Sequence, residues 1–384
     1  MKRIIIWIVL ISILSLFITP FSFAEGELNI KAKSAILMDY NTRKVIYEQN
    51  AHERVAPASI TKIMTLLLAM EALESGKISL NDEVRISAHA AGMGGSQLWL
   101  EEGEIQRVED LIKAVAIRSA NDASVALAEY IAGSEELFVK MMNEKARELG
   151  MNNTNFANAS GLPNENHYTS AYDVGIMSAE LLKHEGIHKW LITYMDEMLV
   201  GKNKDKVQSL VNTNRLIKEY EGTTGIKTGS TTEAGHCLSA SAKRNNLHLI
   251  AVVMGSETSK IRFDETMRLL DYGFANYDSV PVGRKGDVIG KVNVNKGKID
   301  YVEAVLERDS FLLLPKGESG NITKEIVLLD FVEGPIEKGQ ELGKLIVKID
   351  GVEADTIKLV SNISVEKASF KDLLLKTIRK YILG

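Results

Sequence analysis

The sequence has very little cysteine and no excess of basic residues. Its 384 residues include one cysteine, Cys237, so no disulfide can form within the chain and an apolar core must stabilise the fold. The 46 basic residues are outnumbered by 51 acidic ones, giving a net charge of −5. That balance provides no general electrostatic surface for a nucleic-acid backbone. We therefore expect no nucleic-acid partner.

Two common kinds of site are also missing from the sequence. No cysteine, histidine and carboxylate residues are grouped at metal-ligand spacing, and no glycine-rich loop has the pattern that binds phosphate. We therefore expect no metal and no cofactor. The regularly spaced short runs after residue 280 could suggest a repeat, but they show no self-similarity at a fixed period.

The chain has no apolar run of the ~20 residues that a spanning helix needs. An almost unbroken run from Ile4 to Ile18 follows two basic residues and precedes Pro20 and the small residues Ser22 and Ala24. This pattern is typical of a secretory signal peptide cleaved after Ala24, with an uncleaved membrane anchor as the alternative. Removal of residues 1–24 leaves 44 basic and 51 acidic residues and a charge of −7. We expect an exported, acidic protein.

Apolar periodicity predicts a first domain over residues 25–279. The order is a hairpin, several helices, three strands and a closing helix, which favours an α/β (α+β) fold in which helices cover one antiparallel sheet. The helix after Pro57 is apolar on nearly every side and should lie at the domain centre. The expected elements are a hairpin at 34–47, helices at 60–73, 108–117, 122–131, 135–149, 172–183 and 264–274, and strands at 225–231, 236–243 and 247–255.

The pattern of apolar and polar residues changes after residue 280. Short alternating apolar runs are broken by Gly, Pro, Asn and Asp, which predicts a small all-β domain over 280–362. In residues 363–384, apolar side chains recur at spacings of three and four and basic ones lie mostly between them, which predicts an amphipathic helix anchored on a membrane surface. A helix docked on its own domain or on a partner is the alternative. The predicted apolar face comprises Phe370, Leu373, Leu374, Ile378, Tyr381 and Ile382.

Ser59 and Lys62 lie three residues apart at the predicted start of the central helix. A hydroxyl and an amine at this spacing share one helix face. The same spacing occurs at Ser364 and Lys367, so the pattern alone is weak. Only Ser59 lies at the start of a buried helix, where free backbone N–H groups and the positive dipole end can stabilise an oxyanion.

Two further elements follow in order. Ser119 and Asn121 lie at a junction between helices, and Lys227-Thr228-Gly229 lies on a strand. Serine-x-x-lysine, serine-x-asparagine and lysine-threonine-glycine in this order form the established signature of penicillin-binding proteins and β-lactamases. We therefore expect the three elements to form one site.

The chemistry accounts for these residue types. A serine hydroxyl needs a neighbouring base, and Lys62 can act as that base only when it is neutral. Burial and a second cation, Lys227, would both lower the pKa of Lys62. Ser119 could then bridge the two lysines and pass a proton to the leaving amine. Asn121 could hold either a substrate carbonyl or the Lys62 amine.

The strand should take part in binding. Thr228 and Gly229 would let an extended substrate lie beside it by β-augmentation. The backbone N–H groups of Ser59 and Ser230 would hold the oxyanion.

The sequence resembles the low-molecular-mass penicillin-binding proteins that are serine-type D-alanyl-D-alanine carboxypeptidases. The resemblance covers nearly all of the chain after residue 24. It implies a transpeptidase-like catalytic domain, peptidoglycan stem peptides as substrate, β-lactams as covalent inhibitors, and a location on the outer face of the cytoplasmic membrane or in the cell wall. By position, Arg262 resembles the arginine that receives the substrate carboxylate, with a structural salt bridge as the alternative. The matching stretches are APASITKIMT (56–65), RSANDASVALAEYIAGSEELFV (118–139), NTNFANASGLPNENHYTSAYD (153–173), GIKTGST (225–231) and SKIRFDET (259–266).

Several nearby residues have less specific interpretations. Cys237 follows His236, but adjacent strand residues point to opposite faces, so we expect a packed core thiol and no cysteine–histidine pair. No residue stands out as the base for the second half-reaction. Glu165 lies in a loop without the E-x-x-L-N pattern of class A β-lactamases, and His167 is expected to be structural.

Three alternatives to a carboxypeptidase stay open from sequence. A β-lactamase or a D,D-endopeptidase would use the same residues, and a non-catalytic wall-binding protein would use only the β domain and the tail. A separate β domain and an anchor argue against a soluble β-lactamase.

Overall fold

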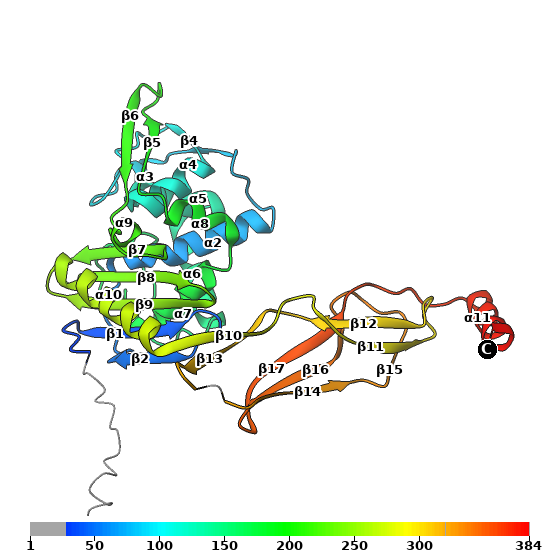
Figure 1. The fold of residues 1–384 in the computed structure, drawn as a ribbon. Coiled ribbons are helices and arrows are strands. Elements are labelled where there is room, and N and C mark those ends of the chain that lie inside the picture. The colour runs from blue at the N-terminus through cyan, green and yellow to red at the C-terminus, as the bar shows by residue number, and fades with distance from the viewer. Residues whose placement is uncertain (1–27, 319, 384) are drawn as a thin grey trace, which may run out of the picture. The chain divides into compact units, whose positions relative to one another are not determined.

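The computed structural model describes residues 28–318 and 320–383, so the expected signal peptide lies outside the described residues. A five-stranded antiparallel sheet forms the centre of the first domain, in the order β2-β1-β9-β8-β7 (Figure 1). The opening hairpin and the three later strands are thus joined in one sheet, as predicted. Its strands are β1 (Ser34–Asp39), β2 (Val45–Gln49), β7 (Thr223–Thr231), β8 (Gly235–Arg244) and β9 (Leu247–Ser256).

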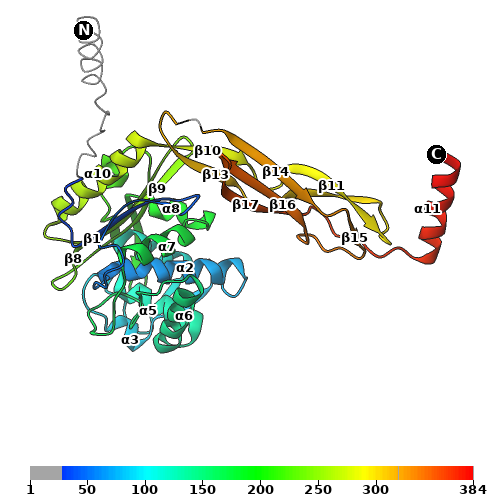
Figure 2. The same ribbon diagram turned by 90° about the horizontal axis from the view of Figure 1, so that it is seen from below.

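Helices α7 (Ala171–Leu181) and α10 (Ser259–Asn276) cover opposite faces of this sheet (Figure 2). A Cβ atom added to Gly175 of α7 would meet Met38, whereas one added to Gly273 of α10 would meet Leu37. Because successive strand residues point to opposite faces, these contacts place the two helices on different sides. Both glycines let the helices approach the sheet closely.

Helix α2 (Lys62–Glu74) is the central helix. Ile63, Met64, Leu66 and Leu67 are all fully buried, which confirms the prediction from its all-round apolar sequence. The helix begins after a single 3-10 turn, η1 (Ala58–Thr61). The interior position of α2 means that anything on its first turn is held in the domain core.

A helix is found at each of the other expected ranges, but the one expected over 264–274 begins earlier, at Ser259, and the short helices at Ala88–Ala91, Glu185–Ile187, His188–Leu191 and Leu216–Glu219 were not predicted. The helix expected over 108–117 is α-helical only to Lys113 and ends in a π-helical turn, η2 (Ala114–Arg118). Turns of this kind are frequent at functional sites. The remaining helices are α3 (Ala88–Ala91), α4 (Val108–Lys113), α5 (Asn121–Ala132), α6 (Glu135–Glu148), η3 (Glu185–Ile187), α8 (His188–Leu191) and α9 (Leu216–Glu219).

Two small hairpins were not anticipated from the sequence. Strands β3 and β4 form one, and β5 and β6 form the other. Strand β6 ends at Val211, just before Thr213 in the chain. The strands are β3 (Glu83–Arg85), β4 (Ile105–Arg107), β5 (Met195–Val200) and β6 (Lys206–Val211).

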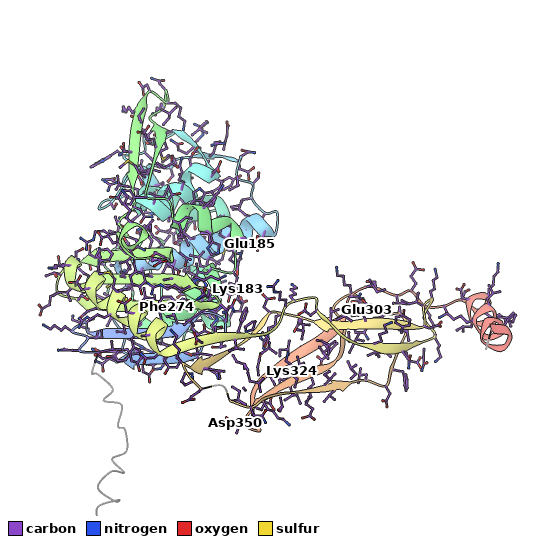
Figure 3. The ribbon with its side chains drawn as sticks, viewed as in Figure 1. Lys183, Glu185, Phe274, Glu303, Lys324 and Asp350 are labelled. Carbon is purple, nitrogen blue, oxygen red and sulfur yellow. The ribbon has the colours of Figure 1, made fainter. Side chains whose placement is uncertain are left out.

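Residues 277–361 form strands, as expected for the small all-β domain. Six of them make a sheet in the order β14-β16-β17-β12-β11-β15, and β10 pairs with β13. Lys324 of β14, labelled in Figure 3, donates a hydrogen bond to the Val282 carbonyl of β10. The strands are β10 (Tyr277–Gly283), β11 (Val288–Asn295), β12 (Tyr301–Leu306), β13 (Ser310–Pro315), β14 (Ile322–Leu328), β15 (Phe331–Glu333), β16 (Glu341–Ile349) and β17 (Val352–Ser361).

The chain's last described element is helix α11 (Phe370–Leu383). Phe370 is 83% exposed, and Leu373, Leu374 and Ile378 are also exposed. The side chains of residues 377 and 379–383, including part of the expected apolar face, lie outside the described residues. Within the described part of the chain, no helix combines the length and apolarity needed to cross a bilayer.

Candidate active site

Ser59 is held in the strained turn that leads into α2. Ala58 has φ +49, a left-handed conformation that is unfavourable for a residue with a Cβ atom. Ser59 follows within η1, and its side chain lines an open pocket of about 730 Å³. The strain at Ala58 therefore accompanies the exposure of the Ser59 hydroxyl on an otherwise buried helix start. The pocket is lined by Ser59, Gly95, Ser96, Ser119, Asn121, Ser160, Gly161, Leu162, Thr213, Thr228, Gly229, Ser230, Thr231 and Arg262.

Lys62 lies beneath this pocket and is fully buried. Its Nζ atom is 3.1 Å from Ser59 Oγ, 2.7 Å from Asn121 Oδ1 and 2.5 Å from the Ser160 carbonyl oxygen. Burial lowers the pKa of Lys62 well below its ordinary value, and the nearby Lys227 lowers it further. The Lys62 amine therefore loses its proton at a lower pH than an ordinary lysine, and it can do so while keeping its hydrogen-bonded position.

The partners of Lys62 determine where a neutral amine points its lone pair. A neutral amine has two protons and one lone pair. Asn121 Oδ1 and the Ser160 carbonyl can only accept hydrogen bonds, so they take the two protons. Asn121 is fixed in this orientation because its Nδ2 donates to the Gly94 carbonyl at 2.6 Å. The lone pair is left facing Ser59 Oγ, whose proton it can accept.

Ser119 and Asn121 follow the π-helical turn. Ser119 has φ +64 and ends that turn, and Asn121 begins α5. The Ser119 Oγ atom is buried and has no hydrogen-bond partner among the described residues, although it lines the pocket. The structure thus places Ser119 in the site but contains no hydrogen bond from it to either lysine.

Strand β7 forms the opposite wall of the pocket. A Cβ atom on Gly229 would lie 2.9 Å from the Ser59 backbone nitrogen and 3.0 Å from that of Ile60. Only glycine therefore lets the strand pass this close to the serine. Thr228, Gly229 and Ser230 all line the pocket, so an extended ligand beside β7 would lie over Ser59.

Lys227 is buried behind this wall, with 1% of its surface exposed. Its Nζ donates to the Thr228 carbonyl at 3.2 Å. Burial, with a smaller effect from Arg262, lowers the pKa of Lys227 to about 7. Lys227 thus lies behind the pocket surface, and its amine is about half protonated at pH 7.

Arg262 of α10 contributes a second buried cation, which reaches the pocket. It is 7% exposed, and its Nη1 donates to the Gly229 carbonyl at 3.1 Å and the Cys237 carbonyl at 3.3 Å. Burial lowers its pKa to about 10, so it stays charged at neutral pH. Its Nε is unpartnered and it forms no ion pair within the described part of the chain. Because buried charges are ordinarily paired, a guanidinium in this position is suited to bind an anion.

A loop to which the sequence assigned no role closes over Lys62. Asn158 Oδ1 accepts hydrogen bonds from the backbone nitrogens of Ser160, Gly161 and Leu162, which holds the Ser160 carbonyl toward Lys62. Gly161 has φ +87, and a Cβ there would lie 1.8 Å from the Ala58 carbonyl oxygen. The sequence stretch NASGL contains no known spacing that would have indicated this role.

The remaining candidates lie outside the pocket lining. Glu165 is exposed. His167 is buried, its Nε2 is 2.8 Å from Thr61 Oγ1, and burial lowers its pKa to about 4. Cys237 is fully buried, which confirms a core thiol, and burial raises its pKa to about 11. Among the described residues, no three histidine, cysteine or acidic side chains are grouped as metal ligands.

The site and the fold together define a penicillin-binding-protein type of serine peptidase. Residues 21–258 match the D-alanyl-D-alanine carboxypeptidase family, peptidase family S11, and residues 277–367 match the penicillin-binding protein 5 C-terminal domain. The chain belongs to this family of D-alanyl-D-alanine carboxypeptidases.

The chain is also similar to individual proteins and to solved structures. The chain is 48% identical to the D-alanyl-D-alanine carboxypeptidase DacF of Bacillus subtilis, over 98% of each chain. It is 33% identical to the D-alanyl-D-alanine endopeptidase of Escherichia coli, over 65% of this chain and 80% of that one. Penicillin-binding protein 5 of Haemophilus influenzae has a similar structure, with TM-score 0.71 and 33% identity over 88% of this chain and 98% of that one.

We expect Gly161→Ala to disrupt the site. The added Cβ cannot lie 1.8 Å from the Ala58 oxygen, so the loop must move and withdraw the Ser160 carbonyl from Lys62. Because small displacements of catalytic groups can cost about 100-fold, we expect at least that loss in the rate at which penicillin acylates Ser59.

Gly133→Ala is the matched control for this change. Gly133 has φ +89, and a Cβ there would meet nothing within 4 Å. The alanine should therefore cost only about 1–2 kcal/mol of backbone strain and leave the acylation rate unchanged. Equal losses of activity in the two variants would contradict the role assigned to the loop.

Proposed function

We propose that the protein removes the terminal D-alanine from peptidoglycan pentapeptide stems through an acyl-enzyme on Ser59. The observation that carries the proposal is the hydrogen bonding of Lys62. Two obligate acceptors hold its amine while Ser59 Oγ lies 3.1 Å away. This is the arrangement that a general base for the serine requires.

In the proposed acylation step, Ser59 Oγ attacks the carbonyl carbon of the penultimate D-alanine as its proton moves to Lys62 Nζ. The developing oxyanion accepts hydrogen bonds from the backbone N–H groups of Ser59 and Ser230. The C–N bond then breaks, and the leaving amine takes a proton from Lys62 by way of the Ser119 hydroxyl. D-Alanine leaves, and the rest of the stem stays as an ester on Ser59.

Binding would align the stem along β7, with its terminal carboxylate toward Arg262. Support comes from the buried guanidinium of Arg262, whose Nε has no hydrogen-bond partner among the described residues. A carboxylate matches its planar donor geometry. This favours the binding role of Arg262 over the structural salt bridge.

Water must hydrolyse the ester in the second half-reaction. No aspartate or glutamate lines the pocket among the described residues. We therefore assign no carboxylate base to this step. We expect the penicillin adduct on Ser59 to outlast that of a class A β-lactamase, in which a glutamate activates the water that hydrolyses the adduct. A long-lived adduct distinguishes the proposal from a β-lactamase.

The proposal is tested by incubating the protein with a tripeptide ending in D-Ala-D-Ala and identifying the products by mass spectrometry. Release of one D-alanine, together with a stable penicillin adduct, is expected. Rapid penicillin turnover without D-alanine release would instead identify a β-lactamase. If a cross-linked peptide dimer is cleaved but the tripeptide is not, the protein is an endopeptidase. If neither the tripeptide nor penicillin reacts, a non-catalytic wall-binding protein is the remaining alternative.

We also propose that the protein is exported and rests on the outer face of the cytoplasmic membrane through residues 363–384. Support comes from the leader-like residues 1–24 and from the exposed Phe370, Leu373, Leu374 and Ile378 of α11. The test is co-sedimentation with anionic lipid vesicles, which should be lost when the chain ends at residue 369. Equal sedimentation of the full and shortened chains would contradict the anchor.

A further inference from the structure

Thr213 contributes a hydroxyl to the pocket from outside the three sequence motifs. It follows β6 and is exposed at the pocket rim. Its Oγ1 lies 2.5 Å from Oγ1 of Thr228, the threonine of the lysine-threonine-glycine element. The hydroxyls of these two threonines therefore form a pair on the wall opposite the Lys62 loop.

Two buried asparagines hold Thr213 in place. Asn212 is 5% exposed and Asn214 is 1% exposed. Asn212 Nδ2 donates to the Thr193 carbonyl at 3.0 Å, its Oδ1 accepts from the Asn214 backbone nitrogen at 2.9 Å, and Asn214 Oδ1 accepts from the Leu216 nitrogen at 3.2 Å. The Thr213 side chain is thus presented from a rigid turn although it is itself exposed.

The proton count of the pair shows what it can bind. Each hydroxyl has one proton to donate. When one threonine donates to the other, the acceptor keeps its own proton free for a third group. That free donor can face the pocket, and the bond it receives makes it a stronger donor. A hydroxyl pair of this kind suits an acceptor-only group such as a carboxylate.

Arg262 lies on the same wall, where its Nη1 donates to the carbonyl of Gly229, the residue after Thr228. A carboxylate offers about four lone-pair sites, more than one guanidinium edge fills. The threonine pair would supply the additional donor. The Arg262 guanidinium and one hydroxyl of the threonine pair would then both donate hydrogen bonds to the same carboxylate.

We propose that Thr213 is a specificity-determining residue that, paired with Thr228, receives the C-terminal carboxylate of the substrate beside Arg262. The inference rests on the proposed carboxypeptidase function and extends it to a residue outside the motifs. It predicts that Thr213 affects the binding of substrates with a free carboxylate and has little effect on the chemical step.

The test compares wild type, Thr213→Val and Thr213→Ser. The inhibition constants of an acyl-tripeptide ending in D-Ala-D-Ala and of its C-terminal amide are measured by competition with a fluorescent penicillin. Losing a hydrogen bond to a charged group typically weakens binding by about tenfold or more. We therefore expect Thr213→Val to raise the inhibition constant of the carboxylate peptide about tenfold. The inhibition constant of the amide and the kcat for release of D-alanine should not change. Thr213→Ser should restore binding.

Thr224→Val is the matched control. Thr224 lies on the same strand, and its Oγ1 pairs with Ser241 Oγ at 2.5 Å outside the pocket lining. This variant should leave both inhibition constants unchanged. Equal effects of Thr213→Val on peptide and amide, a loss confined to kcat, or no effect would each overturn the inference. Failure of the wild type to release D-alanine would instead refute the underlying function.

Discussion

Replacement of Ser59 by alanine is expected to abolish formation of the penicillin adduct. The bond to the acyl group forms on Ser59 Oγ, and no other hydroxyl lies within hydrogen-bonding distance of Lys62 Nζ among the described residues. Removal of the nucleophile of a serine peptidase costs about 10⁶-fold in kcat. Intact-mass measurement after incubation with penicillin should therefore show no increase in mass for Ser59→Ala.

Ser364→Ala is the control for this experiment. Ser364 has the same three-residue spacing to a lysine, Lys367, but its Oγ accepts a hydrogen bond from the Lys338 backbone nitrogen. It lies outside the pocket lining. The variant should form the adduct at the wild-type rate. An adduct on Ser59→Ala would show that another residue is the nucleophile.

Replacement of Lys62 by methionine is expected to slow acylation of Ser59 by about 10³-fold, within the range of a lost general base. Methionine fills much of the same buried space but cannot accept the Ser59 proton. It also leaves Asn121 Oδ1 and the Ser160 carbonyl without their donor. The protein is incubated with fluorescent penicillin, the reaction is stopped at set times, and the labelled protein is quantified to give the acylation rate.

A second substitution separates loss of the base from loss of the charge. Lys62→Arg keeps a cation and several donors, but a guanidinium does not deprotonate in proteins. It should therefore be nearly as slow as Lys62→Met. Lys145 of α6, which pairs with Glu148 of the same helix and with Glu71 near the far end of α2, lies outside the pocket lining, and Lys145→Met should react normally. Substantial activity in Lys62→Arg would contradict the role of a neutral amine.

The sequence could predict the residues of the site because chemistry restricts their type and order. The serine, lysines and asparagine of the three motifs lie in or directly beneath one pocket. The strands of the main sheet were also predictable, since their apolar runs are bounded by clear turn residues. In both cases the information lies within a short stretch of sequence.

Other features depend on contacts between distant segments, and no local pattern indicates them. The Ser160 carbonyl reaches Lys62 across 98 positions of sequence, and a carbonyl has no residue-type signature. Gly161 is required only because the Ala58 oxygen lies against it. The π-helical turn before Ser119 has an ordinary helical sequence. The hairpin that brings Thr213 to Thr228 has weak strand alternation.

The central claim is that Ser59 reacts because Lys62 is neutral, and the pH dependence of the acylation step tests it most directly. The rate at saturating penicillin is measured across the pH range in which the protein stays folded. Since the base form is required, the rate should rise with pH and level off well below 10.5, the ordinary pKa of a lysine. A rate that keeps rising tenfold per pH unit up to that value would contradict the account.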